Sequence, residues 1–171
     1  MIIIVTGAVG IGKTTVCRKV VETLRGRGYA CAGILTDKDA GEDLFVEDVQ
    51  SGRKEILASA SSVYDGPSTP KYSFNPEGIS FGVEAIDRGT AAEVLIVDEL
   101  GLLELEGEGF VKVIELVRSG SVANCILVIR RELLAAFLPR LDAEPFIFRA
   151  TLDNRDRLPP EIETLMAEKL S

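Results

Sequence analysis

A glycine-rich segment directly after the first apolar run constrains this chain more than any other feature. Residues 2–5 are Ile, Ile, Ile and Val, an uninterrupted β-branched run typical of a strand buried on both faces of a parallel sheet. Residues 7–14 fit the pattern GxxxxGK[ST], and apolar residues with helical spacing follow over residues 13–25. This strand–loop–helix order predicts a βαβ fold whose first loop points backbone N–H groups at an anion.

Further apolar runs alternate with helical patterns along the chain. We expect strands at residues 94–97, 125–129 and 146–148, and helices at residues 110–117, 131–138 and 161–170. Two short alternating segments, 44–49 and 54–58, flank Gln50-Ser51-Gly52 and predict a hairpin, and residues 59–76 predict a long loop. The expected fold class is α/β, a Rossmann-like, mostly parallel sheet flanked by helices with an antiparallel hairpin insert, in one domain of 171 residues.

Composition argues against several functional classes. The 19 Lys and Arg against 27 Asp and Glu give a net charge of −8, which disfavours a broad nucleic-acid-binding face. The chain has no histidine, which is the commonest metal ligand and general base. Three widely spaced cysteines, no signal-peptide pattern and no long apolar segment predict a cytoplasmic protein without a membrane span.

The glycine-rich loop gains defined chemical roles if its anion is a polyphosphate. Lys13 would neutralise the outer phosphate oxygens, and the Thr14 hydroxyl would bind Mg²⁺. The alternative is an incidental glycine-rich turn, which the strand before the loop and the helix after it disfavour. The binding residues expected here are Gly7, Ala8, Val9, Gly10, Ile11, Gly12, Lys13, Thr14 and Thr15.

Two carboxylates end the strand predicted at residues 94–97. A phosphate loop requires an acidic group at the end of a neighbouring strand to hold the metal ion, and a second one can activate water. We therefore predict that Asp98 binds Mg²⁺ and that Glu99 is the catalytic base. Taken alone, such a pair is commonly a solvated strand end.

Polar residues also follow two other predicted strands, at the edge of the sheet where open α/β folds bind ligands. Arg130 or Arg131 could stabilise charge on the transferring phosphoryl group, or both could be surface arginines at a helix start. Asn154 and Arg155 could face a nucleotide base, or they could belong to a solvated loop leading to two prolines.

Residues 98–105 read DELGLLEL, similar to the signature DExGxxEL, and residues 151–159 read TLDNRDRLP, similar to T-x-x-N-R-D-x-L-P. With the phosphate loop, these segments occur in the order typical of THEP1-like nucleoside-triphosphatases, also called the cancer-related nucleoside-triphosphatase family, which the chain resembles. The resemblance implies a P-loop fold and Mg²⁺-dependent hydrolysis of ATP, GTP and other nucleoside triphosphates. It also implies a nucleotide site that includes Val97 and Gly101.

Two segments fit this resemblance less directly. The resemblance implies that Glu104 is a further acidic member of the site, although by composition the acidic run 104–108 would form a solvated turn. Residues 37–43 are mostly acidic here, whereas the family usually shows an acidic and then basic stretch there.

The residues leave three classes of function open: a nucleoside-triphosphatase, a nucleotide or small-molecule kinase, and a nucleotide-dependent switch that needs a partner. Glu99 beside Asp98 favours activation of water, whereas the long loop with Lys71 and Tyr72 near its end could cover an acceptor. Beyond Asn154 and Arg155, no base-reading set is visible. We therefore expect ATP, GTP, CTP and UTP to compete for one site.

Overall fold

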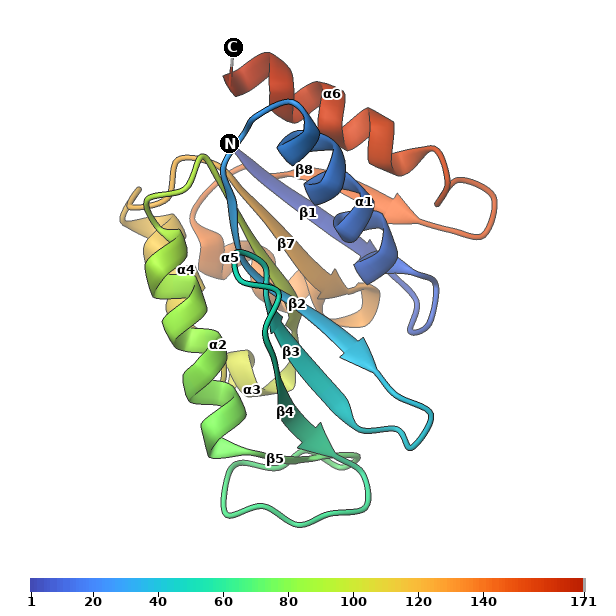
Figure 1. Ribbon diagram of the computed structural model, residues 1–171, viewed down its shortest axis with the longest axis vertical. Coiled ribbons are helices and arrows are strands. Elements are labelled where there is room, and N and C mark those ends of the chain that lie inside the picture. The colour runs from blue at the N-terminus through green and yellow to red at the C-terminus, as the bar shows by residue number, and fades with distance from the viewer. Residues whose placement is uncertain (171) are drawn as a thin grey trace.

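The computed structural model describes residues 1–170, in which an eight-stranded sheet carries helices on both faces (Figure 1). The strand order across the sheet is β5-β4-β3-β2-β6-β7-β1-β8. The strands are β1 (Ile2–Gly7), β2 (Cys31–Lys38), β3 (Leu44–Asp48), β4 (Lys54–Ser59), β5 (Ser73–Phe74), β6 (Val94–Leu100), β7 (Cys125–Arg130) and β8 (Phe146–Ala150). The helices are α1 (Lys13–Gly26), α2 (Pro76–Gly89), α3 (Leu102–Leu105), α4 (Lys112–Arg118), the 3₁₀ turn η1 (Arg131–Leu133), α5 (Leu134–Leu141) and α6 (Leu158–Leu170).

The glycine-rich loop follows a strand of the parallel part of the sheet, next to the edge strand β8. Strands β2, β6, β7, β1 and β8 run parallel to one another, and β1 lies between β7 and β8. Ile3, Ile4 and Val5 of β1 have no exposed surface, as expected for a β-branched strand covered on both faces. The loop after β1 therefore starts at the carboxyl edge of the sheet, with β7 and β8 on its two sides.

Each face of the sheet has its own apolar core, because successive strand residues point to opposite faces. Ile3 and Val5 pack with helices α1 and α6 on one face. Ile4 packs on the other face with α2, α4 and α5. Figure 1 shows α1 and α6 together on one side of the sheet and α2 and α4 on the other. This arrangement confirms the predicted α/β fold class.

The predicted hairpin is present as β3 and β4, which pair antiparallel and continue the sheet beyond β2. The segment that we expected to be a long loop, residues 59–76, contains β5, which pairs antiparallel with β4. A further bridge joins Ser68 to Ser73 within that segment. The end of this loop therefore has a fixed position next to the hairpin.

Strand β2 and helix α2 were not predicted, nor were the short elements β5 and α3. Gly33 lies in the middle of β2 with φ 105°, and a Cβ there would come 2.0 Å from the carbonyl oxygen of Ile96. Gly78 and Gly82 lie in α2, where a Cβ would come 2.1 Å from the carbonyl oxygen of Ile56 and 2.4 Å from the ring of Phe110. These glycines weaken the local sequence signal, and they allow backbones to pack in close contact.

Other differences concern the ends of elements and one acidic run. The helices predicted at 110–117, 131–138 and 161–170 are observed as α4, as η1 with α5, and as α6, which begins earlier than expected. The expectation of a solvated turn at 104–108 is wrong for Glu104, which is buried in α3. Among residues 1–170, none of the helices combines the length and the apolar character that crossing a bilayer requires.

Candidate active site

The loop between β1 and α1 has the backbone shape that an anion cradle requires. Gly10 and Gly12 have φ values of 76° and 98°, in the left-handed region that favours glycine. Helix α1 begins directly after Gly12, so its first N–H groups and the positive end of its dipole face the loop. At the start of the loop, a Cβ on Gly7 would lie 2.8 Å from the carbonyl oxygen of Ala150 in β8. The glycines thus set both the curvature of the loop and its distance from β8.

Lys13 folds back over the loop that precedes it. Its ammonium group donates hydrogen bonds to the carbonyl oxygens of Gly7 (3.3 Å) and Ala8 (2.8 Å), and only 6% of the residue is exposed. Burial lowers the pKa of Lys13, while the nearby carboxylates of Glu99 and Asp98 act in the opposite direction. A cation is therefore positioned inside the curve of the loop.

Asp98 connects the glycine-rich loop to the neighbouring strands. One carboxylate oxygen, Oδ2, accepts hydrogen bonds from the Thr14 hydroxyl (2.6 Å) and from the backbone N–H and hydroxyl of Thr36 (3.2 and 3.1 Å). The other oxygen accepts the backbone N–H of Glu99 (2.8 Å). Burial, followed by the charge of Glu99, raises the pKa of Asp98 to about 6. The fold thus holds the fully buried carboxyl group of Asp98 beside the loop.

Glu99 leaves the strand in a different direction from Asp98. The pairing of β6 with β7 shifts register between Val97 and Leu100, so residues 98 and 99 form a bulge. Glu99 itself has φ 60°, which is uncommon for a residue with a side chain. Its carboxylate pairs with the guanidinium of Arg130 at 3.3 Å, at the end of the adjacent strand β7. The bulge and this left-handed residue, rather than simple strand alternation, separate the two carboxylates.

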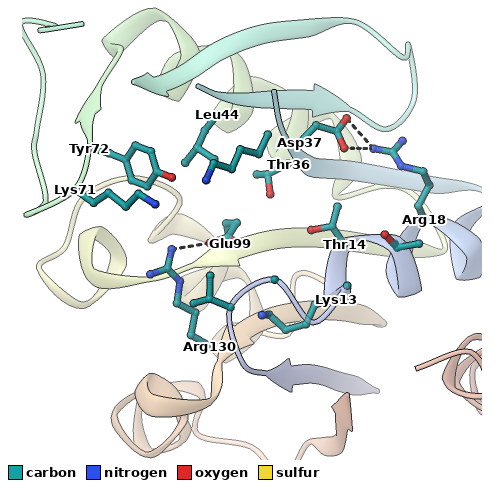
Figure 2. Close-up of a pocket in the computed structure, with 15 residues that line it drawn as sticks. Lys13, Thr14, Arg18, Thr36, Asp37, Leu44, Lys71, Tyr72, Glu99 and Arg130 are labelled. Carbon is teal, nitrogen blue, oxygen red and sulfur yellow. Dashed lines mark hydrogen bonds and ion pairs between the residues drawn. The ribbon is translucent and has the colours of Figure 1, made fainter. Parts of the chain in front are cut away.

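A cavity of about 450 Å³ joins these groups with the antiparallel insert (Figure 2). Lys13, Thr14 and Arg130 lie on the side of the glycine-rich loop, and Leu44, Lys71 and Tyr72 lie across from them. Arg18 on α1 binds Asp37 on β2 through two hydrogen bonds of 3.0 Å, which fixes one wall. The full lining comprises Val9, Gly10, Gly12, Lys13, Thr14, Thr15, Arg18, Thr36, Asp37, Lys38, Leu44, Lys71, Tyr72, Glu99 and Arg130.

Several residues of the sequence prediction lie outside this cavity. Arg131 lines a separate cavity of about 300 Å³ with Gly7, Ala8, Ile11 and Arg149, so only Arg130 of the pair faces Glu99. Arg155 lies beside Thr15 in a third cavity of about 280 Å³ and donates to the carbonyl oxygen of Ile11 at 3.4 Å.

The side chains of Asn154 and Glu104 hydrogen-bond to the backbone of nearby loops, and neither lines the main cavity. The side chain of Asn154 accepts the N–H of Thr151 and donates to the carbonyl oxygen of Arg149. Glu104 is 3% exposed and accepts the N–H groups of Gly101 (2.7 Å) and Phe110 (2.8 Å). Val97 is fully buried in β6. We therefore assign Glu104 to shaping the turn after Glu99.

The sequence prediction also missed residues that line the main cavity. Thr36 lies in the unpredicted strand β2, two residues before its end, and Arg18 lies one helical turn after Thr14. Lys38 is the last residue of β2, within the acidic segment 37–43, and Leu44 is the first residue of β3. The spacing of Arg18 from Thr14 was the one available signal, because residues four apart share a helix face.

Comparison with known proteins identifies the family to which this chain is similar. A family model described as NTPase matches residues 2–163. The nucleoside-triphosphatase THEP1 of Methanopyrus kandleri is 30% identical over 94% of this chain and 92% of its own length. The corresponding protein of Thermofilum pendens is 32% identical over 93% and 91%.

Two solved structures share the fold. The crystal structure of THEP1 from Aquifex aeolicus matches with a TM-score of 0.78 at 24% identity, covering 97% of this chain and 99% of that one. The solution structure of a human cancer-related nucleoside triphosphatase matches with a TM-score of 0.72 at 21% identity, covering 95% of each chain. These matches confirm the resemblance found in the sequence. The chain belongs to the NTPase family.

Proposed function

We propose that this chain hydrolyses nucleoside triphosphates to the diphosphate and inorganic phosphate, with Mg²⁺, in the cavity between the glycine-rich loop and the antiparallel insert. The observation that carries the proposal is the 2.6 Å hydrogen bond from Thr14, which lines the cavity with Lys13 and Glu99, to the buried Asp98 behind it. The names of the relatives support the nucleoside-triphosphatase class. The buried, unpaired thiols of all three cysteines support a cytoplasmic location.

Thr14 and Asp98 fit the coordination chemistry of Mg²⁺. A hydroxyl oxygen and a carboxylate oxygen lie within hydrogen-bonding distance, and both are the hard donors that this ion prefers. Mg²⁺ usually binds through one or two protein oxygens together with substrate phosphates and water. When bound, the ion would draw negative charge away from the phosphates.

The chain's own residues divide the remaining work. The loop N–H groups and Lys13 hold the outer phosphates, so that the terminal phosphorus faces Glu99. Glu99 takes a proton from water as the water oxygen bonds to that phosphorus and the bond to the bridging oxygen breaks. Arg130 pairs with Glu99 at 3.3 Å and keeps its carboxylate oriented. The cavity supplies no dedicated base-reading set, which supports broad use of ATP, GTP, CTP and UTP.

A transfer reaction is the second candidate, and one observation favours it. A further cavity of about 250 Å³ shares Leu44, Lys71, Tyr72, Glu99 and Arg130 with the main one. An acceptor hydroxyl placed there could replace the attacking water.

The deciding experiment is product analysis for the parent chain and for Glu99→Gln, with Mg²⁺ and each triphosphate, in the presence and absence of nucleosides. We expect inorganic phosphate without any acceptor, and a fall in turnover of roughly a hundredfold in Glu99→Gln with nucleotide binding retained. Lys13→Ala serves as the matched variant that should lose binding and turnover together. Phosphorylated nucleoside as the main product would establish the kinase instead, and parental turnover in Glu99→Gln would remove Glu99 as the base.

A further inference from the structure

Lys71 reaches the main cavity from the side opposite the glycine-rich loop. The turn that carries it is tied by two hydrogen bonds, from the N–H of Thr69 to the carbonyl oxygen of Tyr72 (2.8 Å) and from the N–H of Tyr72 to the hydroxyl of Thr69 (3.2 Å). Tyr72 is 8% exposed and packs edge-on against Phe74 of β5. The backbone at Lys71 is therefore anchored, while its side chain extends toward the middle of the cavity (Figure 2).

Among the basic side chains of this cavity, Lys71 has the most distant polar partner, and its ammonium also lies 5.3 Å from the centre of the Tyr72 ring. Its ammonium lies 3.6 Å from Glu42, and both side chains are 54% exposed. Glu42 is closer to Lys38, at 2.6 Å, and would keep that partner if Lys71 moved away. Exposed ion pairs contribute little to stability, so Lys71 can exchange its partner easily.

The other basic side chains that line the cavity have closer partners from other elements. Lys13 donates to two loop carbonyls, with the shorter bond at 2.8 Å. Arg18 binds Asp37 and Glu47 at 3.0 and 2.9 Å, and Arg130 binds Glu99 at 3.3 Å.

We propose that Lys71 contacts the terminal phosphate of the bound nucleoside triphosphate from the side opposite Lys13. This inference rests on the proposed function and adds a residue that distinguishes a triphosphate from a diphosphate. Lys13 sits within the curve of the loop, whereas Lys71 faces that loop across Glu99, on the side where the outermost phosphate group would lie. A charge-assisted contact to a phosphate oxygen is stronger than the long, exposed pair with Glu42.

The test compares Lys71→Ala with the parent chain, using Mg²⁺ with a non-hydrolysable β,γ-imido analogue of ATP, and Mg²⁺ with ADP. Calorimetric titration should give about a tenfold weaker affinity for the ATP analogue and an unchanged affinity for ADP, because one charge-assisted contact is lost only with the triphosphate. Turnover of ATP should fall at least as much, and Lys71→Arg should restore part of both losses. Lys112→Ala is the matched control, because Lys112 is a half-exposed lysine of α4 that pairs with Asp87 and does not line the cavity.

Two outcomes would overturn the inference. Equal losses of affinity for the ATP analogue and ADP would mean that Lys71 only raises the general positive potential at the cavity mouth. Parental affinity and turnover in Lys71→Ala would mean that the side chain does not reach the phosphate. Failure of the proposed function is distinguishable, because the parent chain itself would then release no phosphate from ATP.

Discussion

Replacing Asp98 by asparagine should make the chain more stable without ligand while weakening its response to Mg²⁺ and nucleotide. The carboxylate is fully buried, and its two oxygens together accept four hydrogen bonds, from Thr14, Thr36 and Glu99. Asparagine has nearly the same shape and carries no charge. The substitution therefore isolates the charge from the space that the side chain fills.

The magnitude follows from the pKa of Asp98, which is raised from an ordinary 3.8 to about 6. The folded chain binds this proton more tightly than the unfolded chain, so its stability falls as the pH rises through this interval, by about 3 kcal/mol in all. Asparagine avoids that loss, but its NH₂ group must face a donor such as the N–H of Thr36, which costs about 1–2 kcal/mol. Near pH 7 the variant should thus be more stable by about 1–2 kcal/mol, equivalent to about 3–6 °C in Tm.

The assay is urea unfolding of both chains between about pH 4 and 7, followed by thermal unfolding near pH 7 with Mg²⁺ and ATP. The difference in the free energy of unfolding should reverse its sign across this range, with the parent the more stable chain near pH 4. Nucleotide with Mg²⁺ should raise the Tm of the parent strongly and that of Asp98→Asn far less, because a ligand stabilises according to its affinity for the folded state. A difference that is constant with pH would refute the reasoning.

Three further perturbations test the supporting structure. In urea unfolding, Glu104→Gln should lower the free energy of unfolding by about 1–3 kcal/mol, because an amide group has one oxygen and cannot accept the N–H groups of both Gly101 and Phe110. The control Glu106→Gln, at an exposed position, should leave that free energy unchanged. Gly33→Ala should prevent recovery of folded protein, since its Cβ would meet the carbonyl oxygen of Ile96 at 2.0 Å. The control is Gly28→Ala, because Gly28 has a similar φ of 93° and open space around it. In urea unfolding, this variant should lose only about 1 kcal/mol of its free energy of unfolding. Burial raises the pKa of Cys31 to about 11 and that of Cys125 to about 12, and Cys17 is also fully buried. A thiol reagent such as DTNB near pH 8 should therefore label the cysteines only after unfolding. Rapid labelling of the folded chain would contradict the packing.

The sequence alone could predict the strands that are buried on both faces of the sheet. Strands β1, β6 and β7 are covered on both faces, so their residues form uninterrupted apolar runs. The contact between Thr14 and Asp98 was also within reach, because a loop and a strand end at the same edge of a parallel sheet must lie close together. These parts gave the fold class and the centre of the site.

The parts that could not be predicted depend on contacts between distant segments. Glu104 looks like a member of a solvated acidic run, and it is buried because two backbone N–H groups converge on its carboxylate. The direction of Glu99 depends on a bulge that only the pairing of β6 with β7 creates. Lys71 and Leu44 reach the cavity through the position of the hairpin beside β2, which local sequence patterns do not encode.

The close approach of helix α2 to the hairpin has a consequence for the order in which the chain folds. Glycine at positions 78 and 82 lets the helix backbone touch β4 and Phe110, but each glycine weakens an isolated helix by about 1 kcal/mol relative to alanine. A 14-residue helix of this composition has too little intrinsic stability to form before its partners are in place. We therefore expect α2 to become structured late, on a hairpin that already exists, and its amides to acquire protection from hydrogen exchange after those of β3 and β4.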